Sequence, residues 1–190
     1  MQEILRKPPT ILTERLVLRP LTIEDDEAIY SYASDPLVSK YVSFETANSI
    51  EDTRTFLRSV LDNYRKGVEP GSFAIVMNEG MKLIGTIGYL NWSNVNKRIE
   101  IGYALSRPYW NCGYVTEAAK AMIGYFFRHT DLIRIEARCA VEHTASSRVM
   151  EKAGMTFEGI LRKQALISGR HHDMKMYSVL RDEWQREDHH

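Results

Sequence analysis

The pattern of apolar and polar residues predicts an N-terminal strand and, later in the chain, a series of short strands. Between Arg15 and Arg19, basic residues alternate with Leu16 and Leu18, which is the period-two pattern of a half-buried strand, and Pro20 ends it. Three further β-rich runs occupy Phe73–Met77, Leu83–Trp92 and Arg98–Leu105. Connections of hairpin length join these three runs, so we expect an antiparallel meander.

Helical spacing of apolar residues predicts two helices between the first strand and the meander. Thr22 offers an N-cap with Asp25 three residues later, and Asp35-Pro36 closes this first helix. The second helix, Ser49–Lys66, is followed by a glycine that stops it. The segment between the helices, Val38–Asn48, is a candidate substrate-facing loop, because connecting loops carry a large share of binding residues.

A strand, a helix and a second strand follow one another after the meander and predict a right-handed parallel crossover. They are Arg98–Leu105, Val115–His129 and Leu132–Val141. A short helix, Ala145–Ala153, is closed by Gly154, and a final antiparallel pair follows at Thr156–Gln164 and Asp173–Leu180. We expect a turn at His171-His172 and not a metal site, because the spacing offers no third ligand.

The segment Tyr109–Ala118 is the candidate functional site. It places a short polar turn with one glycine, Gly113, where a strand is followed by a helix. Such a turn exposes free backbone N–H groups together with the positive end of the helix dipole. This combination binds anions, most often phosphate. Similar junctions are also common where no phosphate binds, so the segment alone leaves both interpretations open.

Composition and charge argue against some classes of function. The 190 residues hold 25 basic (Lys, Arg) and 25 acidic (Asp, Glu) side chains, so neither nucleic-acid binding nor attraction to a membrane surface is favoured. With no signal-peptide pattern and no apolar run of membrane-spanning length, we expect a soluble, cytoplasmic protein. Cys112 and Cys139 lack disulfide-scaffold or metal-ligand spacing and are expected to be free thiols. His189-His190 resembles the remnant of a purification tag.

Four segments together resemble the GNAT superfamily of acyl-CoA-dependent N-acetyltransferases, and are most similar to its RimJ/RimL branch, which acetylates ribosomal-protein N-termini. They are Leu12–Arg19, Ile99–Tyr103, Tyr109–Ala118 and Ser146–Gly154. The resemblance implies an α/β (α+β) GNAT fold in a single domain, 1–190, with a core at 12–184 and a tail at 185–190. The expected sheet is mixed and mostly antiparallel, with about seven strands, one parallel splayed pair and about four flanking helices.

The resemblance also implies acetyl-CoA as the cofactor and assigns residues to it. Backbone groups of Tyr103, Ala104 and Leu105 would pair with the pantetheine arm, and one N–H there would stabilise the oxyanion. Backbone N–H groups of the turn would hold the pyrophosphate, namely those of Asn111, Cys112, Gly113, Tyr114, Val115 and Thr116. His143 and Ser146 complete the expected cofactor-binding set.

The turn departs from the family pattern. Trp110 stands where the family has Arg or Gln, Asn111 and Val115 stand where it has small residues, and only Gly113 is kept. Because backbone N–H groups hold a pyrophosphate, such changes are tolerated wherever the backbone still adopts the turn. Asparagine accepts unusual φ angles better than most residues. We therefore expect cofactor binding to be retained with altered affinity. His143 is a second departure, since many relatives have an asparagine there.

Two residues are candidates for proton transfer. The resemblance places Glu100 where many GNAT enzymes have a general base, and its position between two isoleucines would desolvate it partly, which suits that role. Alternatively, it faces solvent and pairs across strands, for example with Lys97. Ser146 matches a proposed proton donor to the thiolate, but a serine at a helix start also caps backbone N–H groups. Since Met150 occupies the place of the family's usual tyrosine, the acid is Ser146, another tyrosine or water.

Other mechanisms and acceptors stay open. Cys112, at a helix N-terminus, could attack the thioester with His143 as partner, although a cysteine in a phosphate turn points its side chain away from the ligand. The chain could also bind acyl-CoA without catalysis. As acceptor, the branch resemblance favours a protein N-terminal α-amine, whose ordinary pKa is near ~8, over a polyamine or an antibiotic. A monomer and a homodimer are both compatible with the sequence.

Overall fold

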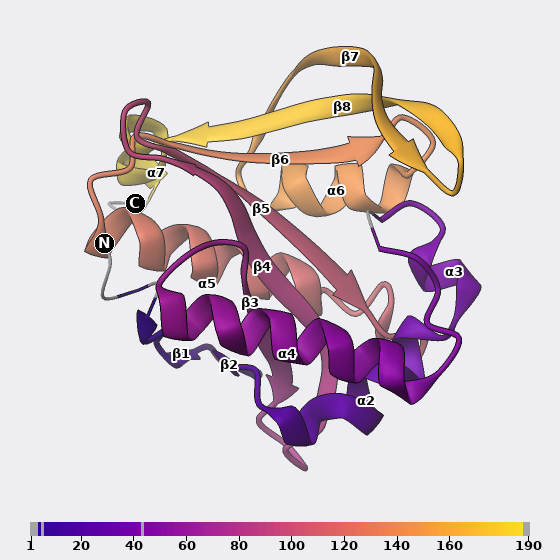
Figure 1. Ribbon diagram of the computed structural model, residues 1–190. Helices are drawn as coiled ribbons and strands as arrows, with labels where there is room; N and C mark the ends of the chain where they lie inside the picture. The colour runs from indigo at the N-terminus through magenta and orange to yellow at the C-terminus, as the bar shows by residue number, and fades with distance from the viewer. Residues whose placement is uncertain (1–3, 5, 43, 188–190) are drawn as a thin grey trace.

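The computed structural model describes residues 4, 6–42 and 44–187, which form one eight-stranded sheet with helices on both faces (Figure 1). The strands are β1 (Ile11–Leu12), β2 (Leu16–Pro20), β3 (Gly71–Met77), β4 (Leu83–Ser93), β5 (Arg98–Leu105), β6 (Arg134–Ala140), β7 (Thr156–Ile167) and β8 (Arg170–Leu180). Their order across the sheet is β1-β2-β3-β4-β5-β6-β8-β7. The α-helices are α2 (Asp26–Ala33), α3 (Pro36–Ser39), α4 (Ile50–Lys66), α5 (Tyr114–His129), α6 (Thr144–Lys152) and α7 (Arg181–Glu187).

The predicted mixed sheet is confirmed, with more elements than expected. Every pair of neighbouring strands is antiparallel except β5 and β6. The additional elements are the two-residue strand β1 and the short helices α3 and α7. Helix α7 spans Arg181–Glu187, so the predicted tail, 185–190, begins inside a helix, and His189-His190 lies outside the described residues. No helix in the described part of the chain has the length and hydropathy to cross a membrane.

Proline and capping residues explain the boundaries around α2 and α3. Thr22 opens a 3-10 turn, Ile23–Asp25, and α2 follows it directly. The predicted stop at Asp35-Pro36 is correct, but Pro36 is also the first residue of α3, where its missing N–H costs nothing. The Asp35 carboxylate caps this helix by accepting a hydrogen bond from Leu37 N (3.0 Å). One dipeptide therefore ends one helix and begins the next.

Helix α4 begins and ends where the sequence predicts. Ser49 Oγ accepts a hydrogen bond from Asp52 N (3.4 Å), and the Asp52 carboxylate accepts one from Ser49 N (3.0 Å), which is a capping box. Gly67 ends the helix with a φ of 67°, a left-handed value that glycine adopts most readily. Phe56 has the helical spacing of the buried residues Leu57 and Val60, yet 40% of its surface is exposed.

Strands β7 and β8 are longer than predicted and meet at a tighter turn. The turn is Ser168-Gly169, with φ values of 50° and 73°. A two-residue type I′ turn needs left-handed values at both positions. The predicted turn at His171-His172 is therefore wrong: both histidines belong to β8, and His172 pairs with Ala165 of β7. Among the described residues, no group of three His, Cys, Asp or Glu side chains is placed to hold a metal ion.

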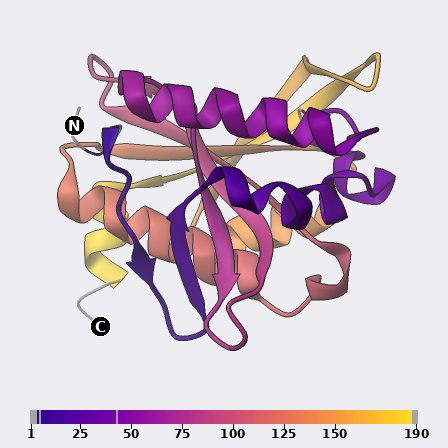
Figure 2. The ribbon, with the colours of Figure 1, turned by 60° about the horizontal axis from the view of Figure 1, so that its bottom comes forward.

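The sheet separates two buried clusters, one packed against α5 and the other against α2 and α4 (Figure 2). Strand β3 contributes to both, since Phe73 and Ile75 belong to the α5 cluster and Ala74 and Val76 to the α4 cluster. A strand covered on both faces has no polar face, which explains the continuous apolar run in this strand. Successive side chains of the central strands thus reach opposite sides of the sheet.

Strands β5 and β6 pair for only three residues and then separate. The parallel pairs are Arg98 with Arg134, Ile99 with Ile135, and Glu100 with Glu136. Beyond these pairs β5 continues to Leu105 beside β4, and β6 continues to Ala140 beside β8. Figure 1 shows the two strands diverging. The predicted splayed pair is confirmed, and it leaves a gap in the hydrogen-bonded ladder.

Two glycines in adjacent strands give a matched test of this packing. A side-chain carbon added at Gly85 of β4 would overlap the Ala104 carbonyl oxygen, whereas one added at Gly102 of β5 would meet no heavy atom within 4 Å. We predict that Gly85→Ala lowers the free energy of unfolding by about 1–3 kcal/mol. Gly102→Ala is predicted to change it by less than about 0.5 kcal/mol. Urea denaturation measures both, and equal losses would contradict the close approach at Gly85.

Candidate functional site

A cavity of about 940 Å³ lies beside the gap between β5 and β6. Its lining includes side chains from both faces of β5, such as Glu100 and Tyr103, together with residues of α4, α6 and β7. The predicted substrate-facing loop, Val38–Asn48, supplies a further part of the wall, from Tyr41, Val42, Phe44, Glu45, Thr46, Ala47 and Asn48. The cavity therefore brings the splayed strands and this loop together.

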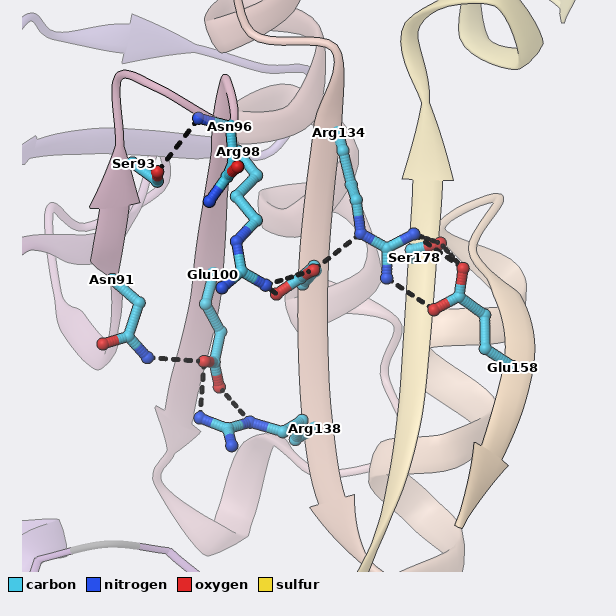
Figure 3. Close-up of polar contacts among 10 residues, drawn as sticks. Asn91, Ser93, Asn96, Arg98, Glu100, Arg134, Arg138, Glu158 and Ser178 are labelled. Carbon is cyan, nitrogen blue, oxygen red and sulfur yellow. Dashed lines mark hydrogen bonds and ion pairs between the residues drawn. The ribbon is translucent and has the colours of Figure 1, made fainter. Parts of the chain in front are cut away.

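Glu100 lies on the cavity wall and is 8% exposed. Arg138 donates hydrogen bonds from Nε to Glu100 Oε1 (2.9 Å) and from Nη2 to Oε2 (2.6 Å) (Figure 3). Asn91 Nδ2 donates a third, to Oε2 (2.9 Å). Lys97, the partner considered from sequence, instead contacts Asp131 (3.2 Å). Glu100 is thus buried and paired beside a cavity, and its partner Arg138 was missed by sequence analysis.

The register of the parallel strands explains this ion pair. Arg98 lies beside Arg134 and Glu100 beside Glu136, an arrangement that places like charges next to each other. Cross-pairs compensate: Arg98 Nη1 and Arg134 Nε both donate to Glu136 Oε1 (3.0 and 2.6 Å) (Figure 3). Arg138, two residues beyond the last parallel pair, does the same for Glu100. The Glu100–Arg138 ion pair therefore lies where the two strands separate.

Tyr103 and Ser146 meet on the other side of β5. The Tyr103 hydroxyl lies 2.9 Å from Ser146 Oγ and 3.3 Å from the Ser146 carbonyl oxygen. Burial raises the pKa of Tyr103, so this hydroxyl stays protonated at neutral pH. The N-cap of α6 is His143, whereas Ser146 Oγ bonds to Tyr103. A tyrosine is the alternative to Ser146 as the acid, and Tyr103 lies on the cavity wall beside Ser146.

Two residues of the turn before α5 adopt left-handed backbone conformations. Gly113 is the N-cap of α5 with a φ of 81°, and Asn111 has a φ of 61°. Glycine and asparagine are the residues that adopt such left-handed values most readily. Trp110 Nε1 donates to the Leu105 carbonyl oxygen (2.8 Å), which ties the turn to the end of β5. The departures at Trp110 and Asn111 are therefore compatible with the turn.

A shallower pocket of about 350 Å³ lies beside this turn. Gly113 and Thr116 border it, and three basic side chains and two glutamates complete its lining. The basic residues are Arg15, Lys120 and Lys152. Lys120 follows Thr116 by one helical turn, a spacing that could have indicated it from sequence. The other two come from distant segments, and only the fold brings them here.

Glu117, in the first turn of α5, joins two of the sequence motifs. Its Oε1 accepts hydrogen bonds from Thr13 Oγ1 (2.6 Å) and Arg15 N (2.8 Å), and its Oε2 accepts one from Arg15 Nε (2.7 Å). Burial disfavours the carboxylate, but these hydrogen bonds outweigh it and lower the pKa of Glu117. The segments Leu12–Arg19 and Tyr109–Ala118 are thus coupled, since one carries the donors and the other the acceptor.

The two residues of the cysteine alternative lie in different surroundings. Cys112 Sγ lies 3.4 Å from the Trp110 carbonyl oxygen, in an exposed part of the turn. His143 lines the large cavity and stacks on Tyr41, with 5.0 Å between ring centroids. Burial lowers the pKa of His143, so its imidazole is neutral at pH 7. No contact within the described part of the chain joins Cys112 to His143.

The remaining predicted cofactor residues differ in exposure. Ala104 lines the large cavity. Leu105 and Val115 are buried in the core, so only their backbone atoms are placed to contact a ligand. The ring of Tyr114 carries the Arg15 guanidinium over its face, 4.5 Å from the centroid. Tyr114 therefore holds Arg15 close to the turn.

Comparisons with known proteins agree with this geometry. Residues 15–156 match the family model of the Acetyltransferase (GNAT) domain. The chain is 34% identical to "Uncharacterized N-acetyltransferase p20" of Bacillus licheniformis, over 92% of this chain and 98% of that protein. It is 28% identical to the provisionally named ribosomal N-acetyltransferase YdaF of Bacillus subtilis, over 93% and 97%. A solved acetyltransferase (GNAT family) from Bacillus anthracis is 34% identical, with a TM-score of 0.81 over 92% of this chain and 99% of that chain.

The contacts of Glu117 predict a pH-dependent loss of stability. A carboxyl whose pKa is lowered on folding adds stability above its ordinary pKa of 4.5, and this stability is lost as the pH falls below that value. We predict that Glu117→Gln lowers the free energy of unfolding at pH 7 by about 1.5–3 kcal/mol. The difference from the wild type should narrow as the pH falls below 4.5.

The matched control is Glu14→Gln, which changes an exposed glutamate in the neighbouring turn. Its free energy of unfolding should stay within about 0.5 kcal/mol of the wild type. Urea denaturation over a range of pH measures both variants. A Glu117→Gln difference that does not change with pH would show that the charge of this carboxylate contributes no stability.

Proposed function

We propose an acceptor and a mechanism for this chain, which belongs to the GNAT family of acetyl-CoA-dependent N-acetyltransferases. The acceptor is the α-amine of a protein N-terminus. One observation carries the mechanism: the gap between β5 and β6 has the Glu100–Arg138 pair on one side of the sheet and the Tyr103–Ser146 pair on the other. Both pairs lie on the wall of one cavity.

The residues around the gap fit coenzyme A. Backbone N–H groups at the start of α5 suit its pyrophosphate, and Lys120 and Lys152 add positive charge beside them. Space for the thioester is supported by Gly102, where an added Cβ would meet no heavy atom within 4 Å. Acetyl-CoA supplies the acetyl group in activated form, as a thioester. The backbone of 103–105 is assigned to its pantetheine arm.

Glu100 is assigned to the acceptor amine. Its Oε2 accepts two hydrogen bonds, from Asn91 and Arg138, whereas its Oε1 accepts one, from Arg138. A carboxylate offers about four acceptor positions, so one remains on Oε1 for the N–H of an amine. Glu100 takes the proton that the nitrogen loses as the N–C bond forms.

Ser146 and Tyr103 are assigned to the departing sulfur. Tyr103 is kept protonated by burial, and its hydroxyl lies 2.9 Å from Ser146 Oγ, a contact in which either oxygen can donate. We assign the Tyr103 hydrogen to Ser146 Oγ, which leaves the Ser146 O–H to turn toward the gap. Ser146 then protonates the sulfur as the C–S bond breaks. Tyr103 thereby acts as a positioning residue in addition to its backbone role.

Two arguments support a protein N-terminus as the acceptor. The relative YdaF, which shares 28% identity over 93% of the chain, carries a name that points to ribosomal N-acetylation. An N-terminal α-amine has an ordinary pKa near ~8, below that of a lysine or an alkyl amine, so more of it is neutral at pH 7. A carboxylate that already accepts several hydrogen bonds is a weaker base, and a weaker base suffices for an amine of lower pKa.

A parallel acceptor screen tests the proposal. Purified protein with acetyl-CoA is offered N-terminal peptides, polyamines and aminoglycosides, and the release of free thiol is measured. We predict release with the peptides. We also predict that Glu100→Gln lowers kcat/KM by about 10²–10⁴-fold, because proton transfer from the amine is lost. Acetyl-CoA binding, measured by calorimetry, should be retained in this variant.

The control variant is Glu136→Gln. Glu136 is buried in the same network of ion pairs but does not line the cavity, so its loss should leave kcat/KM close to the wild-type value. Thiol release with small amines only would contradict the N-terminal assignment. Equal losses of kcat/KM in the two variants would contradict Glu100 as the base.

A further inference from the structure

Arg138 has hydrogen-bonding capacity that its ion pair with Glu100 does not use. A guanidinium carries five N–H donors in a planar fork. Arg138 directs Nε and Nη2 to Glu100, and Nη1 makes no hydrogen bond with the described residues. Figure 3 shows this third nitrogen pointing away from Glu100. The Arg138 side chain is 23% exposed and lines the large cavity, so its free edge is accessible from there.

The position of Arg138 distinguishes it from the other arginines of the network. Arg98 and Arg134 bind Glu136, and neither lines the cavity. The space beside the Glu100–Arg138 pair is open, because Gly102, on the same face of β5 as Glu100, has no heavy atom within 4 Å of an added Cβ. Arg138, with an unused donor nitrogen, and Glu100, with one unused acceptor position, therefore line the same cavity.

We propose that Arg138 determines specificity by binding the carbonyl oxygen of the acceptor's first residue while Glu100 binds its amine. In an α-aminoacyl group, nitrogen and carbonyl oxygen are separated by two carbons and lie about 3 Å apart. Such a group presents an N–H donor beside an acceptor, and the Glu100–Arg138 pair presents the complementary acceptor beside a donor. This inference rests on the proposed function and assigns to Arg138 the recognition of the carbonyl group that every N-terminal α-amine has on its adjacent carbon. An alkyl polyamine lacks that carbonyl.

The identity of the side chain supports this role. Neutralising Glu100 needs only one positive charge, which a lysine would also supply. The guanidinium instead holds two donors on Glu100 and keeps a third nitrogen in a fixed direction. An ion pair alone therefore does not require the planar, multi-donor guanidinium that Arg138 provides.

The test compares two acceptors and two variants. A peptide that begins with glycine and one that begins with β-alanine differ in the carbonyl, which lies one carbon farther from the amine in the second. For Arg138→Lys, we expect kcat/KM to fall about tenfold or more with the glycyl peptide, and much less with the β-alanyl peptide. Arg98→Lys, off the cavity, should leave the preference for the glycyl peptide unchanged.

The outcomes separate this inference from the proposed function. Equal losses with both peptides in Arg138→Lys would overturn the inference, because Arg138 would then act only by holding Glu100. Thiol release with polyamines and with neither peptide, in the wild type, would overturn the proposed function and the inference together. Because each comparison is a ratio between enzymes, the different basicity of the two amines cancels.

A second measurement does not depend on the folding of a variant. In a thioamide peptide, sulfur replaces the first carbonyl oxygen and accepts hydrogen bonds poorly, while the amine stays in place. Wild-type kcat/KM for this peptide should fall at least several-fold below that of the oxygen peptide. Equal values would overturn the assignment of Arg138 to the carbonyl.

Discussion

The ion pair between Glu100 and Arg138 is the interaction on which the site depends. It connects β5 and β6 at the point where their parallel ladder ends after three residue pairs. A buried carboxylate without a partner costs several kcal/mol of stability. Glu100 is tolerated there because Arg138 of β6 reaches across the gap and donates hydrogen bonds to it. The same contact turns the Glu100 carboxylate toward the cavity. The separation of the strands and the placement of the Glu100 carboxylate are therefore one structural feature.

A second set of contacts fixes the other end of the site. Glu117 holds α5 to the β1–β2 segment through Thr13 and Arg15, and the Trp110 indole holds the preceding turn to the end of β5. The turn before α5 and the gap between the strands are thus connected through β5 itself. A ligand that reaches from one to the other meets a spacing set by backbone and hydrogen bonds, which suits the long arm of coenzyme A.

Much of the fold follows from interactions between residues close in sequence. The hydrogen-bond partners of Glu100 and Ser146, which the sequence did not indicate, depend on residues far apart in the chain. Ser49 and Gly67 bound α4, and Gly113 marks the start of α5, because caps and left-handed turns depend on residues a few positions apart. Glu100 and Ser146 were predicted to share a site, and they line one cavity. Their partners are 38 and 43 residues away, in Arg138 and Tyr103. Those pairs depend on the register of a parallel pair and on the packing of α6, which alternation along one strand does not determine.

The structure of the protein bound to a bisubstrate conjugate tests most directly whether the acceptor amine and the thioester meet in the gap between β5 and β6. The ligand is a conjugate in which the sulfur of coenzyme A is linked through an acetyl group to the N-terminal nitrogen of a short peptide. We predict that its sulfur lies within hydrogen-bonding distance of Ser146, with the peptide nitrogen at Glu100 on the opposite side of the gap. A conjugate whose peptide lies outside the gap between β5 and β6, or whose sulfur lies beside Glu100, would contradict this arrangement.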